Sequence, residues 1–211
     1  MAPDFLVTGP ADARVRFVCA HGAGAGMETP FLAAVANLLA ERGIATWRFE
    51  FAYMAARRVG ARKPPPKAER LIPEFVAAVA ALPTGGLTLI GGKSMGGRVA
   101  SMVADDLLAR RQAGGLVCLG YPFHPPKAPQ QLRVAHLKTI KCPTLIVQGE
   151  RDPFGARPEV QTYRLAPAIR IHWASDGDHD LGPRGASGFT RKGNLAAAAD
   201  AVAAFAGELG R

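Results

Sequence analysis

The sequence predicts an α/β protein built on a doubly wound, mostly parallel sheet of six to seven strands. Short apolar runs alternate along the chain with longer amphipathic segments, a pattern that is typical of helices connecting parallel strands. Glycines and prolines separate these segments, and no repeat or domain-splitting linker interrupts them. The connection between Leu119 and Thr144 is too short for a separate cap. We therefore expect one domain that spans residues 1–211.

The expected strands are the short apolar runs of the chain. They cover Val15–Ala20, Ile44–Phe49, Leu87–Ile90, Leu116–Leu119, Thr144–Val147 and Ile169–Ala174, with Phe5–Thr8 as the candidate for a seventh. Helices are expected over Phe31–Arg42, over Glu69–Ala81, directly after Ser94 and from Asn194 onward. Residues 52–70 carry six basic side chains around three consecutive prolines, so we expect a basic surface loop there.

Composition limits the classes of protein that the chain can belong to. The 211 residues are 48% hydrophobic and 20% charged, as in globular proteins that bury a substantial core. Three cysteines without metal-ligand spacing predict a reducing, cytoplasmic location and no bound metal. No apolar stretch has the length of a membrane span, and Asp4 stands where a signal peptide would carry a basic residue.

The net charge of +9 favours encounters with anionic molecules without identifying one. We do not expect nucleic acid to be the partner, and the composition does not determine the oligomeric state.

A serine lies between the expected strand Leu87–Ile90 and the helix that follows it. Gly92-Lys93-Ser94-Met95-Gly96 matches G-x-S-x-G, in which a strained strand-to-helix turn exposes the serine hydroxyl above the sheet. Two other interpretations remain at this point. Ser94 could simply cap the helix, and Lys93-Ser94 faintly resembles a phosphate loop but lacks the preceding glycine spacing. The strand and helix on either side favour Ser94 as a nucleophile.

A nucleophilic serine needs a base and a group that orients the base. Asp152 follows the strand Thr144–Val147 and His179 follows the last strand, so both are expected at the carboxyl edge of the sheet, where ligand sites collect. Asp152 could alternatively serve as a turn residue before Pro153. Neighbouring rival acids are Asp176, Asp178 and Asp180, whose closeness to His179 in the sequence suggests that they shape its loop.

Two backbone N–H groups are candidates to stabilise an oxyanion. His21-Gly22-Ala23-Gly24-Ala25-Gly26 follows the strand Val15–Ala20, and we expect the N–H of Ala23 to be one donor and that of Met95 the other. A flexible glycine-rich turn is the alternative, because the spacing of a nucleotide-binding loop is absent. We expect His21 to fix this loop through hydrogen bonds.

These segments together resemble the α/β-hydrolase superfamily over nearly the whole chain. The resemblance rests on His21–Gly26, Gly92–Arg98, Gly120–Pro126 and Gly149–Asp152, which look like a small subgroup related to testis-expressed hydrolase-like proteins. Dienelactone-hydrolase-like enzymes are more distant relatives. The resemblance implies Ser94 as nucleophile, His179 as base and Asp152 as orienting acid, and it implies no cofactor. Some animal relatives are subunits of an acetyltransferase complex, so membership alone does not establish catalysis.

The leading hypothesis is a serine hydrolase that cleaves a small or medium acyl ester or thioester through an acyl-enzyme intermediate. Candidates for the wall of an open cleft are Tyr121, Phe123, His124 and Met27, although the aromatic rings could equally pack beneath their loop. The competing hypothesis is a noncatalytic interaction module that binds an acidic partner through the basic segment 57–70 or the proline-rich loop after Gly120.

Overall fold

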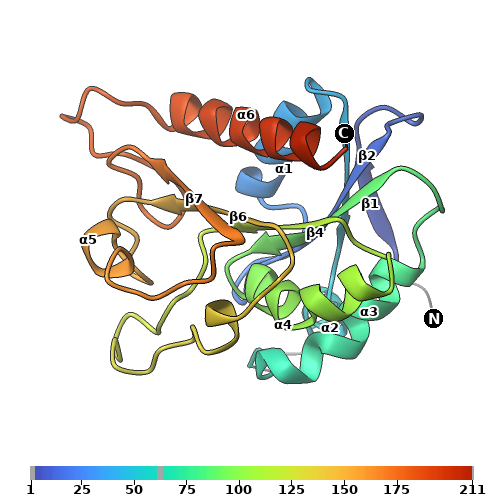
Figure 1. Ribbon diagram of the computed structural model, residues 1–211, viewed down its shortest axis with the longest axis horizontal. Coiled ribbons are helices and arrows are strands. Elements are labelled where there is room, and N and C mark those ends of the chain that lie inside the picture. The colour runs from blue at the N-terminus through green and yellow to red at the C-terminus, as the bar shows by residue number, and fades with distance from the viewer. Residues whose placement is uncertain (1–2, 61–63, 211) are drawn as a thin grey trace.

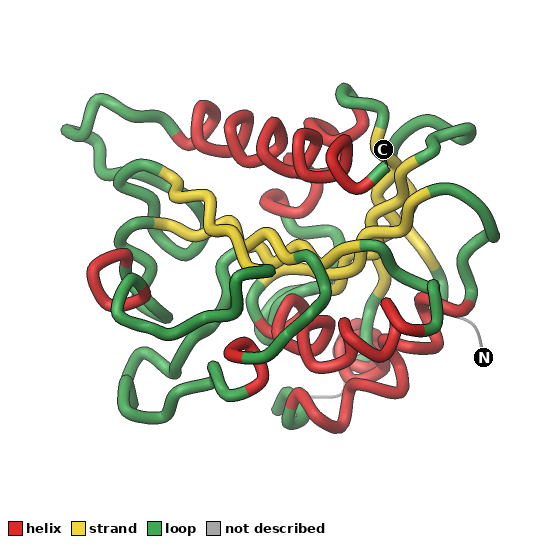
Figure 2. The backbone as a smooth tube through the Cα atoms, in the orientation of Figure 1, coloured by secondary structure: helices red, strands yellow, loops and turns green. Residues whose placement is uncertain are grey.

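A seven-stranded sheet crosses the molecule between two layers of helices (Figures 1 and 2). This computed structural model describes residues 3–60 and 64–210. The strands are β1 (Phe5–Thr8), β2 (Val15–Ala20), β3 (Ile44–Phe49), β4 (Leu87–Lys93), β5 (Gly115–Leu119), β6 (Thr144–Gly149) and β7 (Ile169–Ala174). The expected α/β class and all seven expected strands are therefore confirmed, including the one at Phe5–Thr8.

The strand order is β1-β3-β2-β4-β5-β6-β7, and only β1 runs antiparallel to its neighbour. The chain winds outward from β2 in both directions, so β4 lies at the centre of the sheet. Ser94, Asp152 and His179 follow β4, β6 and β7. Because these strands are parallel, all three residues leave the sheet at the same edge.

The central strands are buried on both faces, as a parallel sheet between helices requires. On β2, Phe17 and Cys19 belong to one core cluster, whereas Val18 and Ala20 belong to the other. This alternation follows from the two-residue period of a strand, which sends successive side chains to opposite faces. The two clusters are the cores beneath the two helical layers.

The helices are α1 (Pro30–Ala40), α2 (Ala52–Arg58), α3 (Ile72–Ala80), α4 (Met95–Ala109), α5 (Arg157–Val160) and α6 (Arg191–Leu209), with 3-10 turns at Ala68–Leu71 and His136–Lys138. α1 and α6 cover one face of the sheet, and α2, α3 and α4 cover the other (Figure 1). α6 begins three residues before the expected Asn194, because the Thr190 hydroxyl accepts a hydrogen bond from the N–H of Gly193 and caps the helix there.

Part of the expected basic loop is helical, which corrects the interpretation of residues 52–70. α2 forms because Tyr53 and Met54 bury their side chains against the core, so that tertiary packing stabilises a short helix that the nearby prolines do not reach. Arg62 and Lys63, which were also assigned to the loop, lie outside the described residues.

The connection between β5 and β6 carries only the 3-10 turn at His136–Lys138, so this connection, which the structure describes in full, holds no separate cap. Within the described part of the chain, no helix combines the length and apolar character needed to cross a membrane. Cys19, Cys118 and Cys142 are buried and form no disulfide.

Candidate active site

Ser94 occupies the sharp turn between β4 and α4 in a strained backbone conformation. Its φ is 51° and its ψ is −114°, which L-residues rarely adopt and which costs about 1–3 kcal/mol. The backbone holds it there, since its N–H donates to the Leu119 carbonyl at 2.9 Å and its carbonyl accepts from the N–H of Arg98 at 3.0 Å. Its side chain makes no capping hydrogen bond, so helix capping does not explain the serine.

Two glycines permit this turn because they remove side chains from a crowded contact with β2. A Cβ atom on Gly92 would lie 2.2 Å from the Ala20 carbonyl oxygen, and one on Gly96 would lie 2.5 Å from the same oxygen. Gly92 also has a φ of +152°, a region that favours glycine. The glycines thus let the start of α4 sit directly against the end of β2.

Asp152 and His179 are joined by a direct hydrogen bond. His179 Nδ1 lies 2.8 Å from Asp152 Oδ2, and the Asp152 side chain is fully buried. Its carboxylate also accepts hydrogen bonds from the N–H of Phe154 at 2.9 Å and from Gln148 Nε2 at 3.0 Å. With Nδ1 held in this way, Nε2 is the ring nitrogen left to exchange a proton with a reacting group.

The imidazole of His179 shares a cavity with Ser94. This cavity, the smaller of two that border Ser94, has a volume of about 280 Å³. Its lining includes the glycine loop, Phe31, Leu32, Lys93, Ser94, Phe154, His179 and Asp180. The Phe154 ring lies 4.4 Å from the His179 ring between centroids, so it restricts the orientations open to the imidazole. The structure therefore brings the serine, the histidine and the acid to one place.

A second, larger cavity of about 510 Å³ also borders Ser94. It shares Ala23, Ser94 and Phe154 with the smaller cavity. Its further lining consists of Pro65, Pro66, Lys67, Ala68, Glu69, Met95, Arg98, Pro122 and Arg133. Ser94 thus stands where two cavities meet.

The glycine loop after β2 is held by aromatic side chains and by His21. The buried His21 ring lies with Nδ1 2.6 Å from the Gly22 carbonyl oxygen, and its Nε2 accepts from the N–H of Phe51. Burial lowers the pKa of His21, which keeps the ring neutral, as this pair of contacts requires. The Tyr53 hydroxyl donates to the Ala23 carbonyl at 3.1 Å. His21 therefore fixes the loop, as expected.

Both candidate oxyanion donors lie beside Ser94. Ala23 lines both cavities and Met95 lines the larger one. Met95 is the first residue of α4, so its N–H has no acceptor within the helix and remains available to a ligand.

Lys93 has a structural position that the sequence did not reveal. Its ammonium donates to the backbone carbonyl of His179, lies 3.2 Å from Asp180 and sits over the Phe31 ring. Burial lowers the pKa of Lys93, while Asp180 and Asp152 oppose that shift. These contacts engage the ammonium and tie the histidine loop to β4, which argues against the faint phosphate-loop resemblance.

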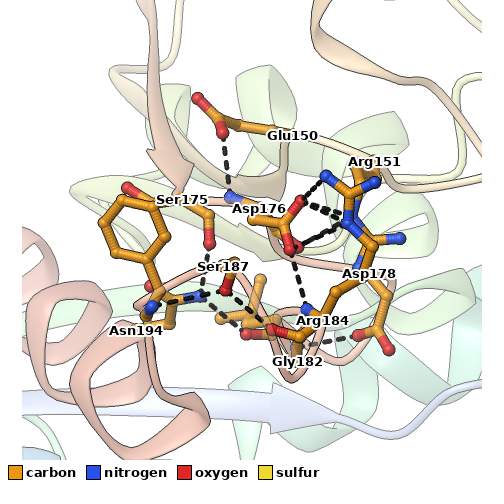
Figure 3. Close-up of polar contacts among 11 residues, drawn as sticks. Glu150, Arg151, Ser175, Asp176, Asp178, Gly182, Arg184, Ser187 and Asn194 are labelled. Atoms are coloured by element: carbon orange, nitrogen blue, oxygen red, sulfur yellow. Dashed lines mark hydrogen bonds and ion pairs between the residues drawn. The ribbon is translucent and has the colours of Figure 1, made fainter.

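The three rival acids near His179 shape its loop. Asp178 Oδ1 accepts from the N–H groups of Asp180 and Gly182, and Asp180 pairs with Lys93. Asp176 lies between Arg151 and Arg184, and its N–H donates to Glu150 (Figure 3). These contacts hold the loop in place and leave Asp152 as the acid on the imidazole.

Asp176 is expected to make the free energy of unfolding depend on pH in the acid range. Hydrogen bonds from Arg184 hold the pKa of Asp176 down to about 2, below the value of about 3.9 for an unfolded chain. The stabilisation is complete above the unfolded pKa and disappears as the pH falls through the folded one. Asp176→Asn should therefore lower the urea midpoint at pH 6, with the difference from wild type shrinking at pH 4 and further at pH 3. A constant difference would contradict this, and Asp106→Asn on the exposed face of α4 is the control.

The expected substrate wall needs correction. Tyr121 and Phe123 are fully buried and pack ring against ring under their loop, and the Tyr121 hydroxyl donates to the Arg133 carbonyl. His124 is buried against Glu159, and Met27 lines a different cavity beside Glu50. Neither cavity at Ser94 includes any of these four among its described lining residues.

Among the described lining residues, Phe154 is the aromatic residue that lines both cavities, and Pro122 lines the larger one. Phe154 stands two residues after Asp152, and that proximity was the available sequence signal. Arg98 ends the segment Gly92–Arg98, but no local pattern indicated that it and Arg133 would line one cavity, because they reach it from different parts of the chain. Within the ranges that the structure describes, no group of three or more His, Cys, Asp or Glu side chains is arranged to hold a metal.

A mostly parallel sheet with a strained serine at the turn after its central strand defines the class of α/β-hydrolase folds. The sequence model of the family described as "Alpha/beta hydrolase domain" matches residues 13–207. The chain belongs to this family.

Solved structures of low sequence identity share the fold. Dienelactone hydrolase from Anabaena variabilis is 21% identical with a TM-score of 0.72, and the match covers 100% of both chains. An alpha-beta serine hydrolase homologue from Coxiella burnetii is 17% identical with a TM-score of 0.69, covering 95% of this chain and 89% of that one. Est1E from Butyrivibrio proteoclasticus is 16% identical with a TM-score of 0.66, covering 96% and 92%.

Proposed function

We propose that the chain is a serine hydrolase of the carboxylesterase or thioesterase kind, acting on a small or medium acyl substrate. The observation that carries this proposal is the hydrogen bond between His179 Nδ1 and the buried Asp152 carboxylate, on an imidazole that lines the same cavity as Ser94. The strained backbone of Ser94 supports the same conclusion. The names of the structural neighbours, which include a dienelactone hydrolase and a serine hydrolase homologue, are consistent with it.

In the proposed reaction, Ser94 Oγ attacks the substrate carbonyl carbon while His179 Nε2 takes the hydroxyl proton. Asp152 stabilises the imidazolium that results. The N–H groups of Ala23 and Met95 donate to the tetrahedral oxyanion, an interaction worth roughly 2.7–4 kcal/mol per donor. His179 then protonates the leaving group, and the same base activates the water that hydrolyses the acyl-enzyme.

A fluorophosphonate probe tests the proposal without knowledge of the substrate. We expect covalent labelling of the wild-type protein at Ser94, located by mass spectrometry of the labelled peptide. The rate of labelling should fall strongly in His179→Ala, because the hydroxyl is a poor nucleophile without its base. His172→Ala, which removes an imidazole from β7, is the matched control and should label normally. A folded wild-type protein that does not react would overturn the proposal and favour an interaction module.

Lys93 is expected to contribute by positioning His179. Lys93→Met keeps the apolar stem but removes the ammonium contacts with the His179 carbonyl and Asp180. Misplacing a catalytic group by about 1 Å can cost up to about 100-fold, so we expect kcat for an ester to fall about 10- to 100-fold with a smaller change in KM. Lys138→Met removes an exposed ammonium elsewhere and serves as the control. Equal kinetics in Lys93→Met and wild type would rule out this role.

The resemblance to testis-expressed hydrolase-like proteins, the cytoplasmic location and the lack of a nucleic-acid partner stay predictions. The choice between ester and thioester is also part of the proposal, since one triad chemistry serves both.

A further inference from the structure

The larger cavity beside Ser94 carries an excess of positive charge. Among its described lining residues, Lys67, Arg98 and Arg133 stand against the single carboxylate of Glu69. The remaining lining is small or apolar and comes mainly from prolines and alanines. A cavity of this composition favours a ligand that has both an apolar stem and a negative charge.

Arg98 lines this cavity and keeps one side-chain donor without a partner among the described residues. It stands one helical turn after Ser94 on α4, where side chains four residues apart are neighbours. Its Nη2 donates to Glu69 at 2.8 Å, but its Nε is buried without a hydrogen-bond partner among the described residues. Orphaned buried donors are rare in folded proteins and call for an explanation.

The guanidinium of Arg133 is not paired with any described carboxylate. Within the described residues, its guanidinium makes neither a hydrogen bond nor an ion pair, although its backbone is bonded to Phe123 and Tyr121. Burial and the positive charge of Arg98 lower the pKa of Arg133, with Tyr121 and Glu69 opposing. A guanidinium nevertheless stays charged in proteins. The two guanidinium groups therefore repel each other in the free protein, and a bound anion would reduce this repulsion.

The position of His179 tells which part of a substrate meets these arginines. His179 lines the smaller cavity and is absent from the described lining of the larger one. A general acid must lie within reach of the atom that it protonates, so the leaving group belongs on the side of the smaller cavity. The acyl group is then directed into the larger, cationic cavity.

We propose that the acyl group of the substrate carries a terminal carboxylate, so that the substrate is a half-ester or half-thioester of a short dicarboxylic acid. The fork of an arginine matches a carboxylate in shape and charge. The Ser94 oxygen forms a bond to the ester carbon, and the bond to the alcohol breaks as His179 supplies its proton. Water then releases the dicarboxylate and restores Ser94. This inference rests on the proposed function and narrows its substrate class.

The first test compares a charged substrate with a neutral one of the same shape. Ethyl hydrogen glutarate and ethyl 4-carbamoylbutanoate differ only in the carboxylate and the amide, and hydrolysis of both is followed by ethanol release. Hydrogen bonds to charged groups are worth more than neutral ones, so we expect kcat/KM to favour the half-ester by about 10- to 100-fold. Equal kcat/KM for the two substrates would overturn the inference.

Arg133→Met assigns the preference to the cavity. The variant keeps the backbone hydrogen bonds of residue 133 and leaves no carboxylate without its partner. A substitution of Arg98 would instead remove the hydrogen-bond donor of Glu69. We expect the ratio of the two kcat/KM values to fall at least about 10-fold, and Arg133→Lys to restore part of it. Arg110→Met removes the same charge from the far end of α4 and should leave the ratio unchanged. A preference that survives Arg133→Met would also overturn the inference.

A protection experiment on the wild-type protein needs no variant and separates the two proposals. Glutarate should slow fluorophosphonate labelling of Ser94, and the neutral diamide glutaramide should not. Labelling that is slowed by neither compound, or equally by both, contradicts the carboxylate site and leaves the serine hydrolase standing. A protein that is neither labelled nor active on any ester overturns the proposed function, and the substrate class with it.

Discussion

Ser94→Ala is expected to abolish ester hydrolysis while leaving the fold intact. Removing the nucleophile of a serine hydrolase can cost about 10⁶-fold in kcat, so turnover of 4-nitrophenyl butyrate should fall to within the background rate. The hydrogen bonds that hold residue 94 use its N–H and carbonyl, and both survive the substitution. We therefore expect the free energy of unfolding to change by less than about 1 kcal/mol.

The measurement is steady-state release of 4-nitrophenolate, with the urea midpoint of the same preparation as a check on folding. Ser187→Ala, in the loop that precedes α6, is the control and should keep wild-type turnover. If Ser94→Ala hydrolysed the ester at the wild-type rate, the activity would belong to another group and the mechanism would be wrong.

Asp152→Asn is expected to lower kcat by about 10²- to 10⁴-fold. Asp152 Oδ2 faces two donors, Gln148 Nε2 and His179 Nδ1, while Oδ1 faces the N–H of Phe154. An amide has only one acceptor oxygen, so an NH₂ group must face a donor in either orientation. With the NH₂ group toward His179, the imidazole would adopt the wrong tautomer or lose its partner, and with the NH₂ group on the other side it would face the N–H of Phe154. The leftover buried donor should also destabilise the fold by about 1–3 kcal/mol.

A matched substitution decides between Asp152 and its neighbours. Asp178→Asn keeps an oxygen for the N–H groups of Asp180 and Gly182 and changes a rival acid in the histidine loop. We expect its kcat to stay within a few-fold of wild type. A loss as large in Asp178→Asn as in Asp152→Asn would show that the carboxylate paired with His179 has been assigned to the wrong residue.

The fold could be predicted from the sequence because its signals are local and repeated. Each buried strand is a short apolar run, and a glycine or proline directly precedes β3, β4, β5 and β6. G-x-S-x-G marks the turn after the central strand by its steric demands. The helix Ala52–Arg58 escaped prediction for the opposite reason. It depends on the burial of Tyr53 and Met54 against distant residues, while the charged and proline-rich segment after it is typical of a loop.

The proposed catalytic residues could be selected because each directly follows a strand, and parallel strands deliver such residues to one edge. The surroundings of the site could not be predicted in this way. Tyr121 and Phe123 turn inward and join the core cluster that contains the buried residues of α4, which no local pattern encodes. Lys93, Arg98 and Arg133 gain their meaning from partners far away in the chain, and those partners are known only once the chain is folded.

Gly92 and Gly96 flank Ser94 and press against the backbone of β2. No larger amino acid fits at either position, so the restriction comes from space and is independent of any reaction. A descendant of this chain that abandoned hydrolysis would still have to retain both glycines to assemble its sheet, whereas nothing comparable would protect the serine hydroxyl. In a comparison of descendants, the presence of both glycines would indicate shared ancestry, and the presence of the serine would indicate that the hydrolytic chemistry had been kept.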